Sequence, residues 1–124
     1  MLARVALAVV AIVVIAWLAV LARDVGLQER AAERSTRGEL DGAAADLRRA
    51  RFLNPDRELD LSLAVVQNGR DRREEAIALI ADVARAEPDN VLAWELLSLY
   101  ARDPSTVRRA RAERRRLDPL GAAD

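Results

Sequence analysis

The chain opens with a long apolar run, and after it charged and apolar residues are interspersed. Residues 5–22 contain no charged residue, no glycine and no proline, and as a helix these 18 residues reach roughly 27 Å, just enough for a hydrocarbon core. Trp17 lies near one end, where interfacial aromatics are typical, and Arg4 and Arg23 flank the run. A buried helix of a soluble domain would show a polar stripe, and this run has none. The pattern predicts a membrane anchor over residues 1–23, with a transmembrane helix at about 5–22.

A second interpretation of the run is a cleaved signal peptide. The small residues of Val20-Leu21-Ala22 fit a cleavage site, which would release an exported soluble module after Ala22. The orientation of a retained anchor is also open. More arginines lie after the run than before it, which favours a cytoplasmic C-terminal part, whereas a very short N-terminal tail often stays inside and exports the rest of the chain. We therefore expect a single-pass protein of the cell membrane, with the side of its remaining chain undetermined.

From residue 24 onward the apolar positions recur at helical spacing. Two segments carry the same face, which reads small, large, small at intervals of four and three residues and lets a second helix lie close. These positions are Ala43, Leu47 and Ala50 in the first segment and Ala76, Ile80 and Val83 in the second. Further helices are expected over 59–67, 91–101 and 106–117, and turns are expected at Gly38, at 68–71 with Gly69 in a left-handed conformation, and at 103–105. Gly26 is a possible bend in a helix that continues the anchor.

Composition removes most catalytic chemistry. The chain has no cysteine and no histidine, which excludes disulfides, thiolate zinc sites and imidazole acid–base catalysis. Its 20 basic residues, all arginine, balance 20 acidic ones, so net charge gives no argument for nucleic acid. Glu39, Asp41 and Asp46 form no loop of oxygen ligands, and no serine has a recognisable base. We predict a protein that is not an enzyme, with no catalytic, cofactor-binding or metal-binding residue.

Proline-containing turns recur along the chain. Pro55, Pro88 and Pro119 are separated by intervals of 33 and 31 residues, and a two-helix period in this range indicates a helical solenoid. The residues resemble the tetratricopeptide repeat family, whose unit is about 34 residues, and the whole chain resembles a small membrane-anchored bacterial member of it. The resemblance covers roughly 24–119 and leaves 120–124 as a frayed tail. The predicted fold class is all-α, with a transmembrane helix before a short solenoid of two to three repeats.

The resemblance is carried by the second helix of the first two units, by the start of the first helix of the third unit, and by the proline that ends each unit. Matching positions are Ala43, Leu47, Ala50 and Pro55 in the first unit, Ala76, Ile80, Val83 and Pro88 in the second, and Trp94, Leu97 and Pro119 in the third. The chain departs from the family at Gln67, where a tyrosine is usual, and at Arg111 and Arg114, where apolar residues are usual. Degenerate ends are expected because terminal repeats face water.

The resemblance also implies a groove along the inner face of the first helices. By position, its lining would be Gln28 and Ala32 in the first unit, Leu61, Val65 and Asn68 in the second, and Leu92, Glu95, Leu99 and Arg102 in the third. Some family members hold a partner's C-terminal carboxylate through lysine and asparagine, and this chain lacks those residues at the matching places. Leu61, Val65 and Leu99 would instead suit an apolar or amphipathic helix of a protein partner. The alternative is that these residues only pack the core.

Residues 108–116 hold six arginines and one glutamate, the densest charge in the chain. They would suit anionic lipid, RNA or an acidic segment, or simply form a solvated last helix whose arginines face the negative end of the helix dipole. No aromatic residue interleaves with them, so base stacking has no support and nucleic acid is not an expected partner.

The sequence thus predicts a non-catalytic, membrane-tethered adaptor or scaffold that binds a protein partner. One alternative is an exported soluble binding module, and another is a lipid- or nucleic-acid-associating protein that uses the arginine-rich last helix.

Overall fold

The computed structural model describes the backbone of residues 2–52, 54 and 56–121, and the side chains of these residues except 2–11, 20, 21 and 24. Within this part every element is an α-helix and no strand occurs, which confirms the all-α prediction. The helices are α1 (Leu2–Thr36), α2 (Leu40–Arg51), α3 (Arg57–Gly69), α4 (Arg73–Ala86), α5 (Val91–Tyr100) and α6 (Pro104–Leu117). Pro55 lies outside the described residues.

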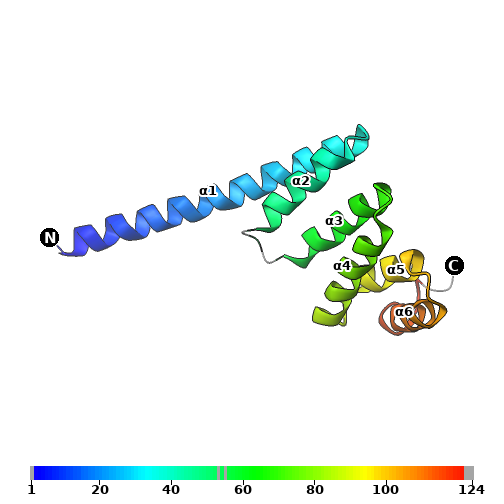
Figure 1. The fold of residues 1–124 in the computed structure, drawn as a ribbon. Coiled ribbons are helices and arrows are strands. Elements are labelled where there is room, and N and C mark those ends of the chain that lie inside the picture. Colours follow the sequence, from blue (N-terminus) through cyan, green and yellow to red (C-terminus); the bar gives the residue numbers. More distant parts are fainter. Residues whose placement is uncertain (1, 53, 55, 122–124) are drawn as a thin grey trace.

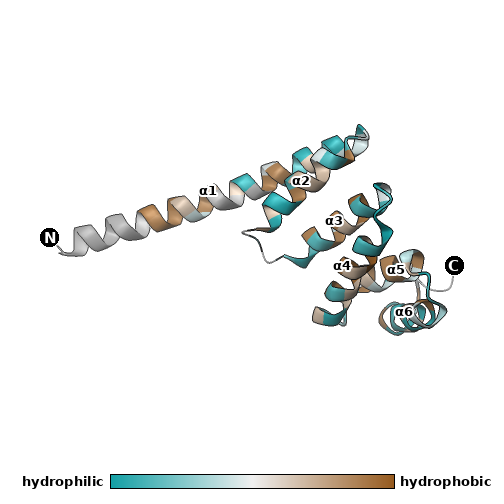
Figure 2. Ribbon diagram, viewed as in Figure 1, coloured by the Kyte–Doolittle hydropathy of each residue, from teal (hydrophilic) through white to brown (hydrophobic). Residues whose placement is uncertain are grey.

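Helix α1 is one unbroken helix of 35 residues, and its N-terminal half projects beyond the other helices (Figure 1). Gly26 lies within this helix and produces no break in it. Every residue of 12–19 is exposed, and brown and pale colours, with no hydrophilic teal, mark this part of α1 in Figure 2. Among the described residues, no helix combines the length and apolar character needed to cross a membrane. The predicted span 5–22 lies partly outside them, at the side chains of 5–11, 20 and 21.

The helices stack in chain order. Each packs against the helix before it and the helix after it, so α1 pairs with α2, α3 with α4 and α5 with α6, and neighbouring pairs join through α2–α3 and α4–α5 (Figure 1). Because contacts run mainly between neighbours in sequence, the arrangement is compatible with a helical solenoid.

Two apolar clusters form the core. The first joins α1, α2 and α3 around Ala43, Leu47 and Leu63, and the second joins α3 to α6 around Ile80 and Trp94. Leu79 packs against both clusters and connects them. The small residues of the small–large–small faces have no exposed surface, so the helices approach closely wherever an alanine faces a neighbour.

Side-chain caps begin three of the helices. Asp56 accepts a hydrogen bond from the Glu58 N–H, Asn90 accepts one from the Ala93 N–H, and Asp103 accepts one from the Thr106 N–H. The Ser105 hydroxyl is the main cause that lowers the pKa of Asp103 from 3.8 to about 2, because its hydrogen bond favours the carboxylate. The cap at Asp103 fixes where α6 begins.

The turn between α3 and α4 differs from the prediction. Gly69 is the last residue of α3, and the left-handed residue is Asp71, with φ of 59°. An aspartate tolerates this conformation better than most residues. The turn is tightened by the buried Gln67, which donates to Glu75 (2.5 Å) and accepts from Arg70 (2.6 Å). Gln67 thus stabilises this turn where the family pattern has a tyrosine.

Candidate functional site

The residues predicted for the partner groove have very different exposures. Leu61 is only 3% exposed and packs in the second core cluster, so it offers no surface to a partner and is corrected to a core residue. Val65 (46%), Leu92 (48%) and Leu99 (62%) are exposed apolar side chains. Of the remaining predicted groove residues, Asn68 and Glu95 are half-buried and Arg102 is exposed.

The structure forms a groove between α1 and α3, and this surface is called the inner groove below. It has a volume of about 500 Å³. Its lining comprises Gln28, Glu29, Ala31, Ala32 and Ser35 from α1, Leu47 from α2, and Leu59, Ser62, Val65 and Val66 from α3. Three of these, Gln28, Ala32 and Val65, are residues that the resemblance placed in a groove, and here they meet.

The chemistry of the inner groove is mainly apolar. Leu47, Leu59 and Val66 are buried and form its floor, and Val65 is an exposed wall. On the α1 side the wall of the groove is low at Ala31 and Ala32, because each of these side chains is only a methyl group. Glu29 is the one charged residue of the lining. A groove of this kind suits the apolar face of an amphipathic helix, and Glu29 could pair with a basic side chain of that helix.

Leu99 does not belong to the inner groove. It lies with Ser98 at a separate hollow on α5 and α6, whose other lining residues are Arg111, Arg114 and Arg115. The predicted lining therefore separates into one apolar surface on α1 and α3 and one basic surface at the end of the chain. Position in a repeat placed Val65 and Leu99 on equivalent helices, but the packing of α6 gives them different surroundings.

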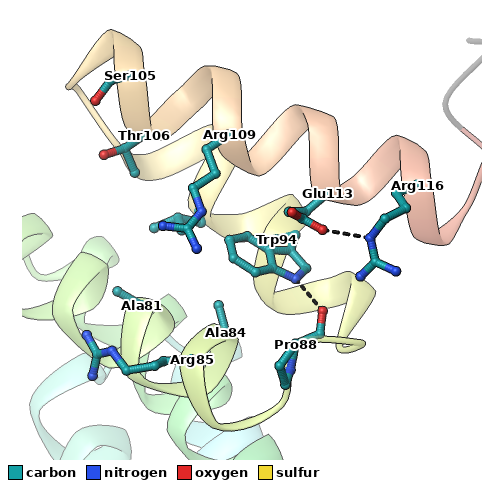
Figure 3. A pocket seen from close by; sticks show the side chains of 11 residues that line it. Ala81, Ala84, Arg85, Pro88, Trp94, Ser105, Thr106, Arg109, Glu113 and Arg116 are labelled. Atoms are coloured by element: carbon teal, nitrogen blue, oxygen red, sulfur yellow. Dashed lines mark hydrogen bonds and ion pairs between the residues drawn. The ribbon is translucent and has the colours of Figure 1, made fainter.

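A larger pocket of about 670 Å³ lies between α4, α5 and α6 and is called the Trp94 pocket below (Figure 3). Trp94 forms its floor and is nearly buried. The indole Nε1 donates to the Pro88 carbonyl oxygen at 2.8 Å, and the Arg109 guanidinium lies over the ring, 5.8 Å from its centroid. Pro88 thus lies in the turn after α4, and its carbonyl oxygen holds Trp94 of α5 in place.

The polar groups around the Trp94 pocket are largely engaged with one another. Arg116 donates to Glu113 at 2.8 Å and to Asp89 at 3.4 Å, and these carboxylates raise its pKa, the hydrogen bond to Glu113 most (Figure 3). Arg85 donates to Asp82 at 2.7 Å. The network connects α6 to the turn before α5, so we interpret this pocket first as part of the packing of the last helix pair.

Sequence reasoning did not find the Trp94 pocket. Its walls come from helices that are about 20 residues or more apart in sequence, such as those of Arg85 and Arg109. Periodicity indicated that Trp94 packs inward, but it carried no signal for the space left between α4 and α6.

Known proteins give no direct guide to function. No protein-family model matches the chain, and no curated protein matches it. Among the described residues, no group of three or more acidic side chains is placed to hold a metal ion. Function must be inferred from the inner groove and from the exposed apolar part of α1.

Proposed function

We propose that this protein is a non-catalytic, membrane-tethered adaptor with tetratricopeptide-like repeats. Residues 5–22 hold it in the bilayer, and the inner groove binds the apolar face of an amphipathic helix from a protein partner. The observation that carries the proposal is the inner groove itself, which is mainly apolar, has a volume of about 500 Å³ and lies between the first helices of two successive helix pairs. Tethering raises the effective concentration near membrane partners, so modest affinity suffices.

The exposed apolar stretch of α1 supports the tether. Ile12, Ile15 and Trp17 are each about two-thirds exposed, and the whole of 12–19 has no covering helix in the described structure. Apolar surface in water is unfavourable by roughly 25 cal/mol for each Å². An amphipathic helix hides one face, but this stretch is apolar on all faces. Lipid chains are the surroundings that match such a helix.

The burial pattern supports the repeat assignment. Ala43 and Ala50 on α2, and Ala76 and Val83 on α4, have no exposed surface. These are the positions that the family pattern keeps small because the first helix of the unit lies against them. The chain pairs α1 with α2 and α3 with α4 as that pattern requires.

The test is site-specific photo-crosslinking in membranes. A photoreactive residue replaces Val65 in the inner groove, and a matched one replaces Ala78, an exposed residue of α4. We expect a discrete light-dependent adduct from position 65 that is lost when Ala32→Glu places a charge in the groove. Ala78→Glu is the control for that charge, and helical melting curves check that each variant is folded.

Identical adducts from positions 65 and 78, or a position-65 adduct that survives Ala32→Glu, would rule out the groove as the binding site. The intact mass of the membrane-bound protein reports on the tether separately. Loss of residues 1–22 would show that the chain is cleaved and leave the groove, which begins at Gln28, on a free module.

A further inference from the structure

Three arginines meet where the apolar part of α1 ends. Arg23 and Arg30 on α1 and Arg49 on α2 line a hollow of about 370 Å³, together with Ala22, Gly26 and Leu27. This surface is called the arginine hollow below. Gly26 and the short Ala22 leave the space open, because neither side chain extends into it. The hollow lies apart from the inner groove and shares none of its lining residues.

The guanidinium groups of the arginine hollow are poorly neutralised. Among the described side chains, no carboxylate lies within ion-pair distance of Arg23 or Arg30, whereas Arg51 of α2 and Arg57 of α3 each have such a partner in Asp60. Arg49 reaches Asp46 only at 3.9 Å, while Arg34 holds the same carboxylate at 3.0 Å. Glu29, the neighbour of Arg30 in sequence, lines the inner groove instead. In the part of the chain that the structure describes, Asp46 is the one carboxylate within ion-pair distance of any of the three arginines, and Arg34 holds it more closely than Arg49 does.

Their height along α1 matches the headgroup layer of a bilayer. Arg23 comes directly after the last residue of the apolar run, and Arg30 lies about 10 Å further along the helix axis. The polar layer on each side of a bilayer is roughly 5–8 Å thick. Long arginine side chains extend along a helix to reach that layer. With residues 5–22 in the hydrocarbon core, the arginine hollow faces the lipid phosphates.

We propose that Arg23, Arg30 and Arg49 bind the phosphate of an anionic membrane lipid. The inference rests on the proposed function, because it needs α1 in the bilayer. A guanidinium donates two parallel hydrogen bonds to phosphate oxygens, and basic pockets between helices at the bilayer surface suit anionic headgroups. Since Arg49 comes from α2, a bound lipid connects the first helix pair to the bilayer surface and fixes how the inner groove is presented.

Helix α6 has more arginines but the wrong position. It lies at the end of the molecule opposite to the projecting part of α1 (Figure 1). Arg108, Arg111 and Arg115 on α6 are exposed and therefore provide a control set with the same change of charge.

The test compares lipid preference in the full-length protein. Wild type, R23Q/R30Q/R49Q and the control R108Q/R111Q/R115Q are purified in detergent with equal amounts of phosphatidylglycerol and phosphatidylcholine, and bound lipid is counted by native mass spectrometry. We expect wild type and the control to bind more phosphatidylglycerol than phosphatidylcholine. In R23Q/R30Q/R49Q the ratio of the two bound lipids should fall by about fivefold for each arginine removed. The charge-preserving R23K/R30K/R49K should recover only part, because lysine lacks the paired donors.

Each outcome decides a different point. Equal preference in wild type and R23Q/R30Q/R49Q overturns the lipid site, and equal losses in both arginine sets reduce it to net charge. If wild type binds inorganic phosphate more tightly than R23Q/R30Q/R49Q does while the two proteins show equal lipid preference, the hollow binds free phosphate and not a lipid. A carbonate wash of membranes that hold wild type tests the tether first. Release of the protein in that wash overturns both the tether and the lipid site, whereas retention with no lipid preference overturns the lipid site alone.

Discussion

Alanines set the distance between helices in this protein. Ala43, Ala50, Ala76, Ala93 and Ala110 have no exposed surface, and each belongs to one of the two core clusters between helices. A methyl group in such a place allows two backbones to come close, and any added carbon must displace a neighbour. Ala76 is the strongest case because Ile80 and Val83, on the same face of α4, are also fully buried.

Replacing Ala76 by leucine should therefore destabilise the fold. We expect Ala76→Leu to lower the free energy of unfolding by about 1–3 kcal/mol, since the larger side chain overpacks the α3–α4 contact. Ala78→Leu adds the same atoms to an exposed position of the same helix and should change it by less than about 0.5 kcal/mol. Urea titration followed by circular dichroism measures both. Equal stability of Ala76→Leu and wild type would contradict the tight packing of this face.

At the scale of the helices, ion pairs to buried carboxylates join successive elements. Asp46 on α2 is nearly buried and lies 3.0 Å from Arg34 of α1, and Asp60 on α3 is nearly buried and lies 2.5 Å from Arg51 of α2. The contacting oxygens, Oδ2 and Oδ1, accept no well-aligned hydrogen bond, so the charge of the arginine is their main compensation. These pairs help to define which faces of the helices meet.

Removing Arg34 should cost about 1–3 kcal/mol of stability, because Asp46 is then left buried with only the more distant Arg49. The half-exposed position of Arg34 keeps the effect below that of a fully buried pair. Arg34→Gln is compared with Arg48→Gln, which removes an exposed charge from α2 and should be nearly neutral. Thermal melts at the same pH give the difference. Similar melting temperatures for the two variants would show that the Asp46 pair contributes nothing to the α1–α2 contact.

On the scale of the whole molecule, α1 has two roles along one helix. Its N-terminal half projects, whereas Leu27 and Ala31 near its other end pack into the first core cluster against α2 and α3. Since the helix is unbroken between these parts, the position of the inner groove is fixed relative to the projecting segment. A partner held in the groove would lie close to the point where the proposed tether ends.

This division predicts the result of two truncations. A chain of residues 23–124 keeps Leu27 and Ala31 and should unfold cooperatively with nearly the stability of the α1–α6 stack. A chain of residues 38–124 leaves α2 without its first partner and should be less stable by about 2 kcal/mol or more, from the lost burial of Leu27 alone. Denaturant titrations of both chains measure the difference. Indistinguishable midpoints would mean that α1 is not part of the folded domain.

Local patterns of residues were enough to locate the helices and the faces on which they pack. Helical spacing located Ala43, Leu47 and Ala50 and their counterparts on α4 because periodicity depends only on the local geometry of one helix. Prolines and caps such as Asp103 placed helix ends for the same reason, since their effects reach only a few residues.

Packing between helices settled what each remaining position faces. Leu61 and Val65 are equally plausible groove residues on one helix, yet the second core cluster buries Leu61, whereas Val65 stays exposed in the inner groove. Arg23, Arg30 and Arg49 form one hollow only because α2 returns along α1. Such surfaces depend on how whole helices are placed against one another, and no local pattern of residues carries that placement.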